Sequence, residues 1–113
     1  MVTSSYVPKQ GDIVWLDFNP QTGHEQSGRR PALVLSPLGY NQKTSLALLC
    51  PVTNQVKAYP FEVLIPENLP ISGVILSDQV KNLDWTARNT EFIEKLESKK
   101  MHDVIDRIEV LIK

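Results

Sequence analysis

Four ionisable side chains lie close together near the start of the chain. The segment GHEQSGRRP holds His24, Glu25, Arg29 and Arg30 between two glycines and a closing proline. A carboxylate can act as a general base, an arginine can stabilise a phosphorane through two hydrogen bonds, and an imidazole titrates near pH ~6.5. Together these groups suit the cleavage of a phosphate ester. The alternative is that Arg30 pairs with a carboxylate such as Asp17, while Glu25 and His24 lie in solvent.

The charge of the chain is unevenly distributed. Its 113 residues carry a net charge of −1, which gives no general attraction to nucleic acid. Residues 19–59 nevertheless contain four cationic side chains and one anionic side chain, so this stretch has a net charge of +3. Such a stretch fits either a local phosphate site or chance clustering on a solvated surface.

Size and composition predict one folded domain, residues 1–113. Hydrophobic residues make up 42% of the chain and charged residues 22%, as in ordinary globular proteins. The sequence has no apolar run of membrane-spanning length and no signal-peptide pattern, so we expect a cytoplasmic protein without membrane association. The single cysteine, Cys50, excludes an internal disulfide, and its apolar neighbours predict a buried, inert thiol.

Short apolar runs separated by turn-forming residues predict a small β-barrel. Residues 12–18 alternate in polarity and are rich in β-branched and aromatic side chains, which is typical of a strand. Turns are expected in the intervening segments, including residues 37–44. Further strands are expected at residues 31–36, 45–52, 61–65 and 73–80.

The C-terminal segment predicts an amphipathic helix that begins after Ser98, a suitable N-cap. Such a helix covers the core of its own domain or contacts a second copy of the chain. Its apolar residues recur at spacings of three and four: Met101, Val104, Ile105, Ile108, Leu111 and Ile112.

A series of motifs extends over nearly the whole chain. YVPKQGDIVWLDFNP is followed by GHEQSGRRPALVLSP, YNQKT, CPVTNQVKAYPFEV and GVILSDQVK, and the chain ends in IEVLIK. In this order, the motifs resemble those of the MazF/PemK/Kid toxins of bacterial toxin–antitoxin systems. The resemblance implies a mainly β fold with helices, an SH3-like small barrel of the MazF/Kid/CcdB type, plus the C-terminal amphipathic helix. It also implies an endoribonuclease, or mRNA interferase, that inhibits translation and growth.

The resemblance implies roles for individual residues. Glu25 and Arg30 match the acidic and basic catalytic residues of the MazF type, and Thr53 matches a threonine that contacts the scissile phosphate. His24 matches a histidine of the Kid type. Three consecutive residues fall where family members contact RNA bases or assist catalysis: Ser77, Asp78 and Gln79.

The role of Asp78 is open at this stage. Kid-type enzymes carry an arginine two residues before the matching aspartate, whereas this chain has Leu76. The difference disfavours Asp78 as a catalytic base and favours the arrangement of Glu25 with Arg30. Asp78 is then a base-reading or a structural carboxylate.

The implied reaction is attack by the RNA 2′-hydroxyl on the adjacent phosphorus. It gives a 2′,3′-cyclic phosphate and a 5′-hydroxyl. Because the nucleophile belongs to the substrate, positioning and electrostatic stabilisation can drive the reaction, and we expect neither a metal ion nor a cofactor.

Loop side chains offer the groups that read single-stranded RNA. Amides can bond to base edges, cationic groups can bind phosphates and a ring can stack, although each residue alone also fits a solvated loop. Trp15 and Trp85 could stack on bases or belong to the core. The candidate RNA-binding residues are Arg29, Asn41, Gln42, Lys43, Asn54, Gln55, Lys57 and Tyr59.

The implied partners are single-stranded mRNA, a second copy in a homodimer, and a cognate MazE-type antitoxin with an acidic tail. Two other functions compete with this interpretation. CcdB-type gyrase poisons share the fold but end in a Trp-Gly-Ile-type tail, whereas this chain ends in VLIK. A barrel that binds RNA or antitoxin without catalysis is disfavoured by the set of Glu25, Arg30 and Thr53.

Overall fold

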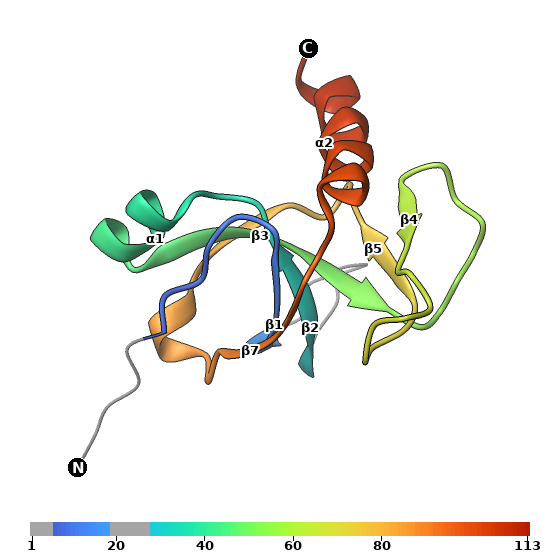
Figure 1. The fold of residues 1–113 in the computed structure, drawn as a ribbon. Helices are drawn as coiled ribbons and strands as arrows, with labels where there is room; N and C mark the ends of the chain where they lie inside the picture. Colours follow the sequence, from blue (N-terminus) through green and yellow to red (C-terminus); the bar gives the residue numbers. More distant parts are fainter. Residues whose placement is uncertain (1–5, 19–27) are drawn as a thin grey trace.

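A strongly curved antiparallel sheet forms the body of the protein. The computed structural model describes residues 6–18 and 28–113 (Figure 1). Seven strands form the sheet, which confirms the predicted mainly β fold with a C-terminal helix. The strands are β1 (Asp12–Phe18), β2 (Gly28–Val34), β3 (Leu46–Thr53), β4 (Glu62–Leu64), β5 (Val74–Leu76), β6 (Lys81–Asp84) and β7 (Glu91–Lys95).

The sheet runs in the order β4-β5-β3-β2-β1-β7, and β6 pairs with β3 on the edge opposite β2. All pairings are antiparallel, so short connections suffice between neighbouring strands. The long strand β3 is central, because its Leu46 half pairs with β6 and its Thr53 end pairs with β5.

Both faces of the sheet are apolar, because successive residues of a strand point to opposite faces. Ile13, Leu33 and Cys50 belong to one buried cluster. Their neighbours Val14 and Leu49 belong to a second cluster, against which Tyr6, Leu83 and Trp85 pack. This division explains why β1 is buried almost throughout rather than on alternate residues.

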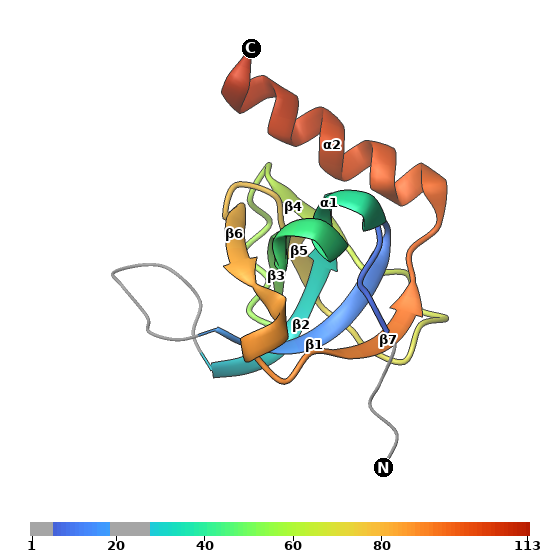
Figure 2. The ribbon, with the colours of Figure 1, turned by 90° about the vertical axis from the view of Figure 1, so that its left-hand side faces the viewer.

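Helix α2 (Ser98–Ile112) covers the first of these faces with its residues up to Ile108. Met101 and Val104 are buried in the first cluster, and Ile105 and Ile108 pack against it. The C-terminal end extends beyond the sheet (Figure 2). Val110, Leu111 and Ile112 accordingly remain 51–75% exposed. The predicted apolar stripe therefore exists but is not fully covered by the chain's own core.

The expectation for Ser98 is wrong in detail. The helix begins at Ser98 itself, Glu97 holds the N-cap position, and no side chain caps the first turn. The described residues contain no helix that is both long and apolar enough to cross a membrane.

Four further elements were not predicted. Residues 37–44, expected as a turn, form helix α1 (Leu38–Thr44) after Pro37. The polar strand β6, the short helix η1 (Trp85–Ala87) and strand β7 follow the last predicted strand. These segments lack a strong apolar period, and their structure depends on pairing with β3 and β1.

Candidate active site

Arg30 and Thr53 come from neighbouring strands and line the same hollow. Strands β2 and β3 pair with Ala32 opposite Pro51, and this register, extended by two residues, places Arg30 opposite Thr53. The hollow, called the first hollow below, has a volume of about 430 Å³. Its other walls are Trp15, Arg29, Pro31, Val52, Asn54, Pro70, Ile71 and Ser72.

Thr53 is held in place at the end of β3 and is only 7% exposed. Its Oγ1 accepts a hydrogen bond from the Gln55 backbone N–H at 3.2 Å, so the hydroxyl proton can be donated to another group. Gly73 lies against it with φ of +116°, and a Cβ there would approach the Thr53 carbonyl oxygen to 2.3 Å. The close pairing of β3 and β5 at Thr53 therefore requires glycine at position 73.

A second hollow adjoins the first, because Thr53 lines both. Its volume is about 290 Å³, and it contains most of the predicted RNA-binding groups on this side of the molecule. Asn54, at the edge of the first hollow, is fixed by a 3.0 Å hydrogen bond from the Ser72 hydroxyl. The residues that line the second hollow are Thr53, Gln55, Lys57, Tyr59, Glu62, Leu76, Asp78 and Gln79.

Tyr59 and Asp78 interact across the second hollow. The negative charge of Asp78 and a hydrogen bond between the two side chains raise the pKa of Tyr59, because both favour the protonated phenol. Tyr59 is 47% exposed, and its ring lies 5.8 Å from that of Phe61. The hollow thus presents an aromatic ring next to a carboxylate, a combination that can stack on a base and accept a hydrogen bond from its amino group.

Arg29, not Arg30, pairs with Asp17. Its guanidinium lies 3.3 Å from the Asp17 carboxylate, forms an ion pair with Glu91 and donates to the Asn89 carbonyl at 2.8 Å. The Asn89 amide also bonds to Asp17 at 2.9 Å, and this bond, together with Arg29, holds the pKa of Asp17 below its usual range. Arg29 therefore joins β1 and β2 to the segment that precedes β7.

The structure contradicts the expectation that Asn41 contacts RNA. Asn41 is fully buried, and its side-chain amide donates to the carbonyls of Pro8 at 2.7 Å and Ser36 at 3.0 Å. Gln42 and Lys43 are exposed on the same helix, α1, which contacts the Leu46 end of β3, whereas Thr53 lies at the other end (Figure 1). These three residues are therefore not brought into the two hollows.

Ser77 is also fully buried, and its Oγ has no hydrogen-bond partner among the described residues. Its side chain is thus not available to RNA, unlike those of Asp78 and Gln79.

Cys50 is buried as predicted, and burial raises the pKa of its thiol to about 12. Trp85 packs against the second core cluster and donates from Nε1 to the Asn41 carbonyl at 2.9 Å, which identifies it as a core residue.

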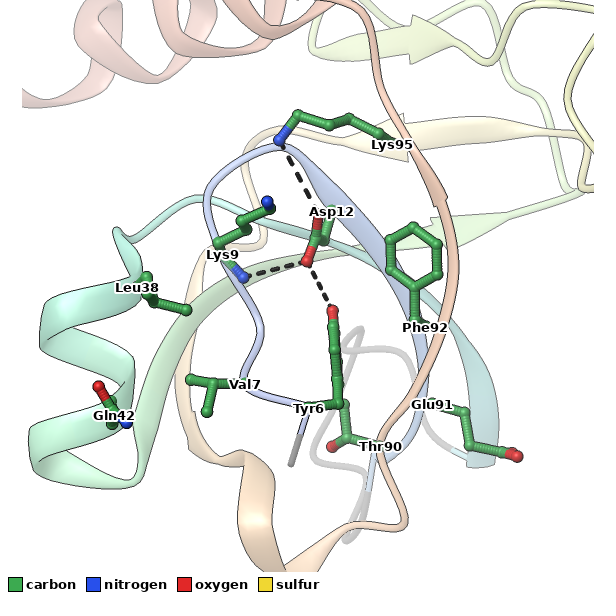
Figure 3. A pocket seen from close by; sticks show the side chains of 10 residues that line it. All are labelled: Tyr6, Val7, Lys9, Asp12, Leu38, Gln42, Thr90, Glu91, Phe92 and Lys95. Atoms are coloured by element: carbon green, nitrogen blue, oxygen red, sulfur yellow. Dashed lines mark hydrogen bonds and ion pairs between the residues drawn. The ribbon is translucent and has the colours of Figure 1, made fainter. Parts of the chain in front are cut away.

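A third hollow, of about 1010 Å³, lies between the N-terminal segment, α1 and β7 (Figure 3). In it the Tyr6 hydroxyl and the Lys9 backbone N–H donate to Asp12 Oδ2 at 2.7 and 3.1 Å, and Lys95 Nζ lies 3.9 Å from Oδ1. Burial and the Asp12 carboxylate raise the pKa of Tyr6. These contacts attach the N-terminal segment to the sheet, and Gln42 is the predicted RNA-binding residue that lines this hollow.

Two predicted catalytic residues, His24 and Glu25, lie outside the described residues. Trp15, for which the sequence allows either stacking on bases or a core position, is half-buried and lines the first hollow. Pro70, Ile71, Ser72 and Glu62 were not predicted at all. Their sequence neighbourhood has only turn character, and the pairing of β5 with β3 and β4 is what brings them to the site.

Comparison with known proteins gives several matches over nearly the whole chain. Residues 9–112 match the family described as PemK-like, MazF-like toxin of type II toxin–antitoxin system. The endoribonuclease toxin MazF of Escherichia coli K12 is 44% identical, over 98% of this chain and 99% of the relative. The endoribonuclease PemK of Escherichia coli is 30% identical, over 92% and 81%.

Solved structures match as well. The crystal structure of MazF from Deinococcus radiodurans has a TM-score of 0.93 and 48% identity, and the match covers 96% of this chain and 98% of that one. A MazE–MazF complex from the same organism has a TM-score of 0.86 and 46% identity, covering 95% and 97%.

Proposed function

Because the chain belongs to the PemK-like, MazF-like toxins of type II toxin–antitoxin systems, we propose that it is an endoribonuclease that cuts single-stranded mRNA without a metal ion. The observation that carries this proposal is the position of Thr53. It lies between a hollow that contains Arg30 and a hollow that contains Tyr59, Asp78 and Gln79. One hollow suits a phosphate and the other suits a base.

The scissile phosphate occupies the first hollow in this proposal. The RNA 2′-hydroxyl attacks phosphorus, the new O2′–P bond forms, and the P–O5′ bond breaks. Arg30 stabilises the charge of the phosphorane with its planar guanidinium, and the Thr53 hydroxyl donates a hydrogen bond to a phosphate oxygen. By its match to the family motif, Glu25 takes the 2′-hydroxyl proton. A second group returns a proton to the departing 5′-oxygen, and His24 is the titratable neighbour in the same motif.

A neighbouring base occupies the second hollow. Tyr59 stacks on it, the amides of Gln55 and Gln79 bond to its edge, and Lys57 binds the adjoining phosphate. Asp78 lines this hollow and not the one that contains Arg30, which supports a base-reading role for its carboxylate over a role as catalytic base. The exposed Asn54, at the edge of the first hollow, contacts the RNA between the scissile phosphate and the neighbouring base.

We also propose that the toxin is a cytoplasmic homodimer and that an antitoxin with an acidic tail inhibits it by lying across the cationic loops and the hollow that contains Arg29 and Arg30. The exposed apolar end of α2, residues 110–112, supports a protein contact. The MazE–MazF complexes of Deinococcus radiodurans, which match this chain closely, support an antitoxin partner. Light scattering of the purified chain at micromolar concentration measures the oligomeric state directly.

The purified protein is expected to cut RNA in the presence of EDTA at the rate seen without it, and to leave DNA of the same sequence intact. The products should carry 2′,3′-cyclic phosphate and 5′-hydroxyl ends, which enzymatic end-labelling distinguishes from 3′-hydroxyl and 5′-phosphate ends. Loss of cleavage in EDTA, restored by added Mg²⁺, would contradict the metal-free mechanism. A gyrase poison of the CcdB type would leave RNA uncut in both conditions.

A further inference from the structure

The segment 57–61, which lines the second hollow, is held by a carboxylate. Glu62, the first residue of β4, turns its side chain back so that its Oε1 and Oε2 accept the Lys57 backbone N–H at 3.2 and 3.1 Å. Oε1 also accepts the Tyr59 backbone N–H at 3.4 Å. In return, the Glu62 backbone N–H donates to the Tyr59 carbonyl at 3.0 Å.

The conformation of Ala58 explains why two backbone donors meet at one side chain. Ala58 lies between Lys57 and Tyr59 with φ of 55°, in the left-handed region that L side chains rarely adopt. Backbone N–H groups that flank such a residue converge and form a small anion-binding concavity. In this protein the anion is the Glu62 carboxylate, and its bonds offset the cost of the unfavourable backbone at Ala58.

The other side of the segment is attached to helix α2. Arg107 donates from Nε to the Pro60 carbonyl at 2.9 Å. The Ser77 backbone N–H donates to the Phe61 carbonyl at 3.0 Å, next to Asp78. The segment is therefore fixed at three points, with Lys57 and Tyr59 exposed at the rim of the second hollow across from Asp78.

We propose that Glu62 is a positioning residue for RNA recognition: its carboxylate fixes the 57–59 backbone so that Lys57 and Tyr59 meet the RNA in a preformed geometry. The inference rests on the proposed function, because it assigns the second hollow to the base next to the scissile phosphate. A preformed loop loses less conformational entropy when RNA binds. The role concerns binding, since Glu62 lies in the second hollow and not in the hollow that contains Arg30.

The variant Glu62→Gln tests this role, because glutamine keeps the size but removes the charge and one of the two acceptor oxygens. Without RNA, amide hydrogen exchange at Lys57 and Tyr59 should become about tenfold faster. With RNA, KM should rise about tenfold while kcat stays within about twofold. The matched control is Glu67→Gln, which removes the same charge from an exposed residue outside both hollows and should behave like wild type.

A second variant, Arg107→Met, keeps most of the side-chain stem but removes the bond to Pro60. It should raise KM about threefold with kcat unchanged, and it tests the positioning of the segment even if Glu62→Gln fails to fold. A wild-type KM in a folded Glu62→Gln variant would overturn the positioning role alone. Unchanged amide exchange at Lys57 and Tyr59 would overturn it as well. A wild-type protein that cuts no RNA would instead overturn the proposed function itself.

Discussion

Arg29 and Arg30 are adjacent in sequence and line the same hollow, yet their surroundings assign them different roles. Arg29 bonds to Asp17, Glu91 and the Asn89 carbonyl, so its donors are used to hold strands together. Arg30 lies opposite Thr53 across the β2–β3 register, where a phosphate can reach both. The sequence predicts Arg29 as an RNA-binding residue and does not predict its ion pairs, because Asp17 and Glu91 lie on other strands.

The two arginines are expected to respond differently to the same substitution. Arg30→Lys keeps the charge but loses the planar fork, and should lower the single-turnover rate by on the order of 10²-fold. Arg29→Lys should leave the rate within a few-fold of wild type but lower Tm by a few degrees, because it removes the guanidinium that bonds to Asp17, Glu91 and the Asn89 carbonyl in a partly exposed cluster. Single-turnover kinetics and thermal unfolding of both variants measure this. Equal loss of rate in the two would contradict the assignment.

Among the elements, strand β3 separates the predicted residues into two groups, one at each of its ends. Helix α1 lies at its Leu46 end and the two hollows lie at its Thr53 end, a strand length of about 23 Å away. Strand β5 pairs with the Thr53 end, and this pairing brings residues 70–72 to the first hollow. Gly73 permits the close approach of the two strands, since a Cβ at this position would lie 2.3 Å from the Thr53 carbonyl oxygen.

Gly73→Ala should therefore disturb the site from outside it. The added Cβ would lie 2.3 Å from the Thr53 carbonyl oxygen at a φ of +116°. We expect a loss of about 3 kcal/mol of stability and a fall in cleavage rate as Thr53 moves. The control is Gly39→Ala in α1, where a Cβ meets nothing within 4 Å and alanine favours the helix. The prediction is checked by the midpoints of chemical denaturation and the cleavage rates of both variants. A wild-type midpoint for Gly73→Ala would show that position 73 does not require glycine.

The elements that the sequence predicts well are those with a strong apolar period. The strand at residues 12–18 and the helix expected after Ser98 are confirmed, the latter beginning one residue earlier. The strands expected at 31–36, 45–52 and 61–65 exist with shifted ends, and only Val74–Leu76 of the segment 73–80 is strand. Helix α1 was missed because Pro37, Gly39 and Asn41 are typical turn residues. The structure stabilises it through tertiary bonds of Asn41, whose amide fills a buried polar site and whose carbonyl accepts from Trp85.

Part of the site could be predicted, from family resemblance and not from the apolar periodicity that predicts the strands and the C-terminal helix. The joint position of Arg30 and Thr53 followed from resemblance to a family, because no local pattern links residues so far apart in the sequence. The contributions of Glu62 and Gly73 depend on backbone geometry, the first through a left-handed Ala58 and the second through contact with a neighbouring strand. Residue types and spacing carry no signal for such contacts.

At the scale of the whole molecule, the two hollows and the uncovered end of α2 belong to different parts of the surface. The hollows open where β2, β3 and β5 meet, whereas the C-terminal end of α2 extends beyond the sheet (Figure 2). Arg107 connects the two regions, because it lies on α2 and donates to the Pro60 carbonyl beside the second hollow. A partner that binds the end of α2 can therefore leave the hollows open to RNA.

In the proposed reaction, the RNA supplies its own nucleophile. The most direct measurement uses an RNA oligonucleotide whose cleavage site has been mapped, and a second copy with one 2′-deoxy sugar on the 5′ side of that site. Removal of this single oxygen leaves the phosphates and bases that the two hollows contact. We predict that cleavage of the modified site is abolished, while its binding affinity stays within about threefold of the unmodified RNA. Cleavage of the 2′-deoxy site at a rate near that of the unmodified RNA would contradict attack by the RNA 2′-hydroxyl.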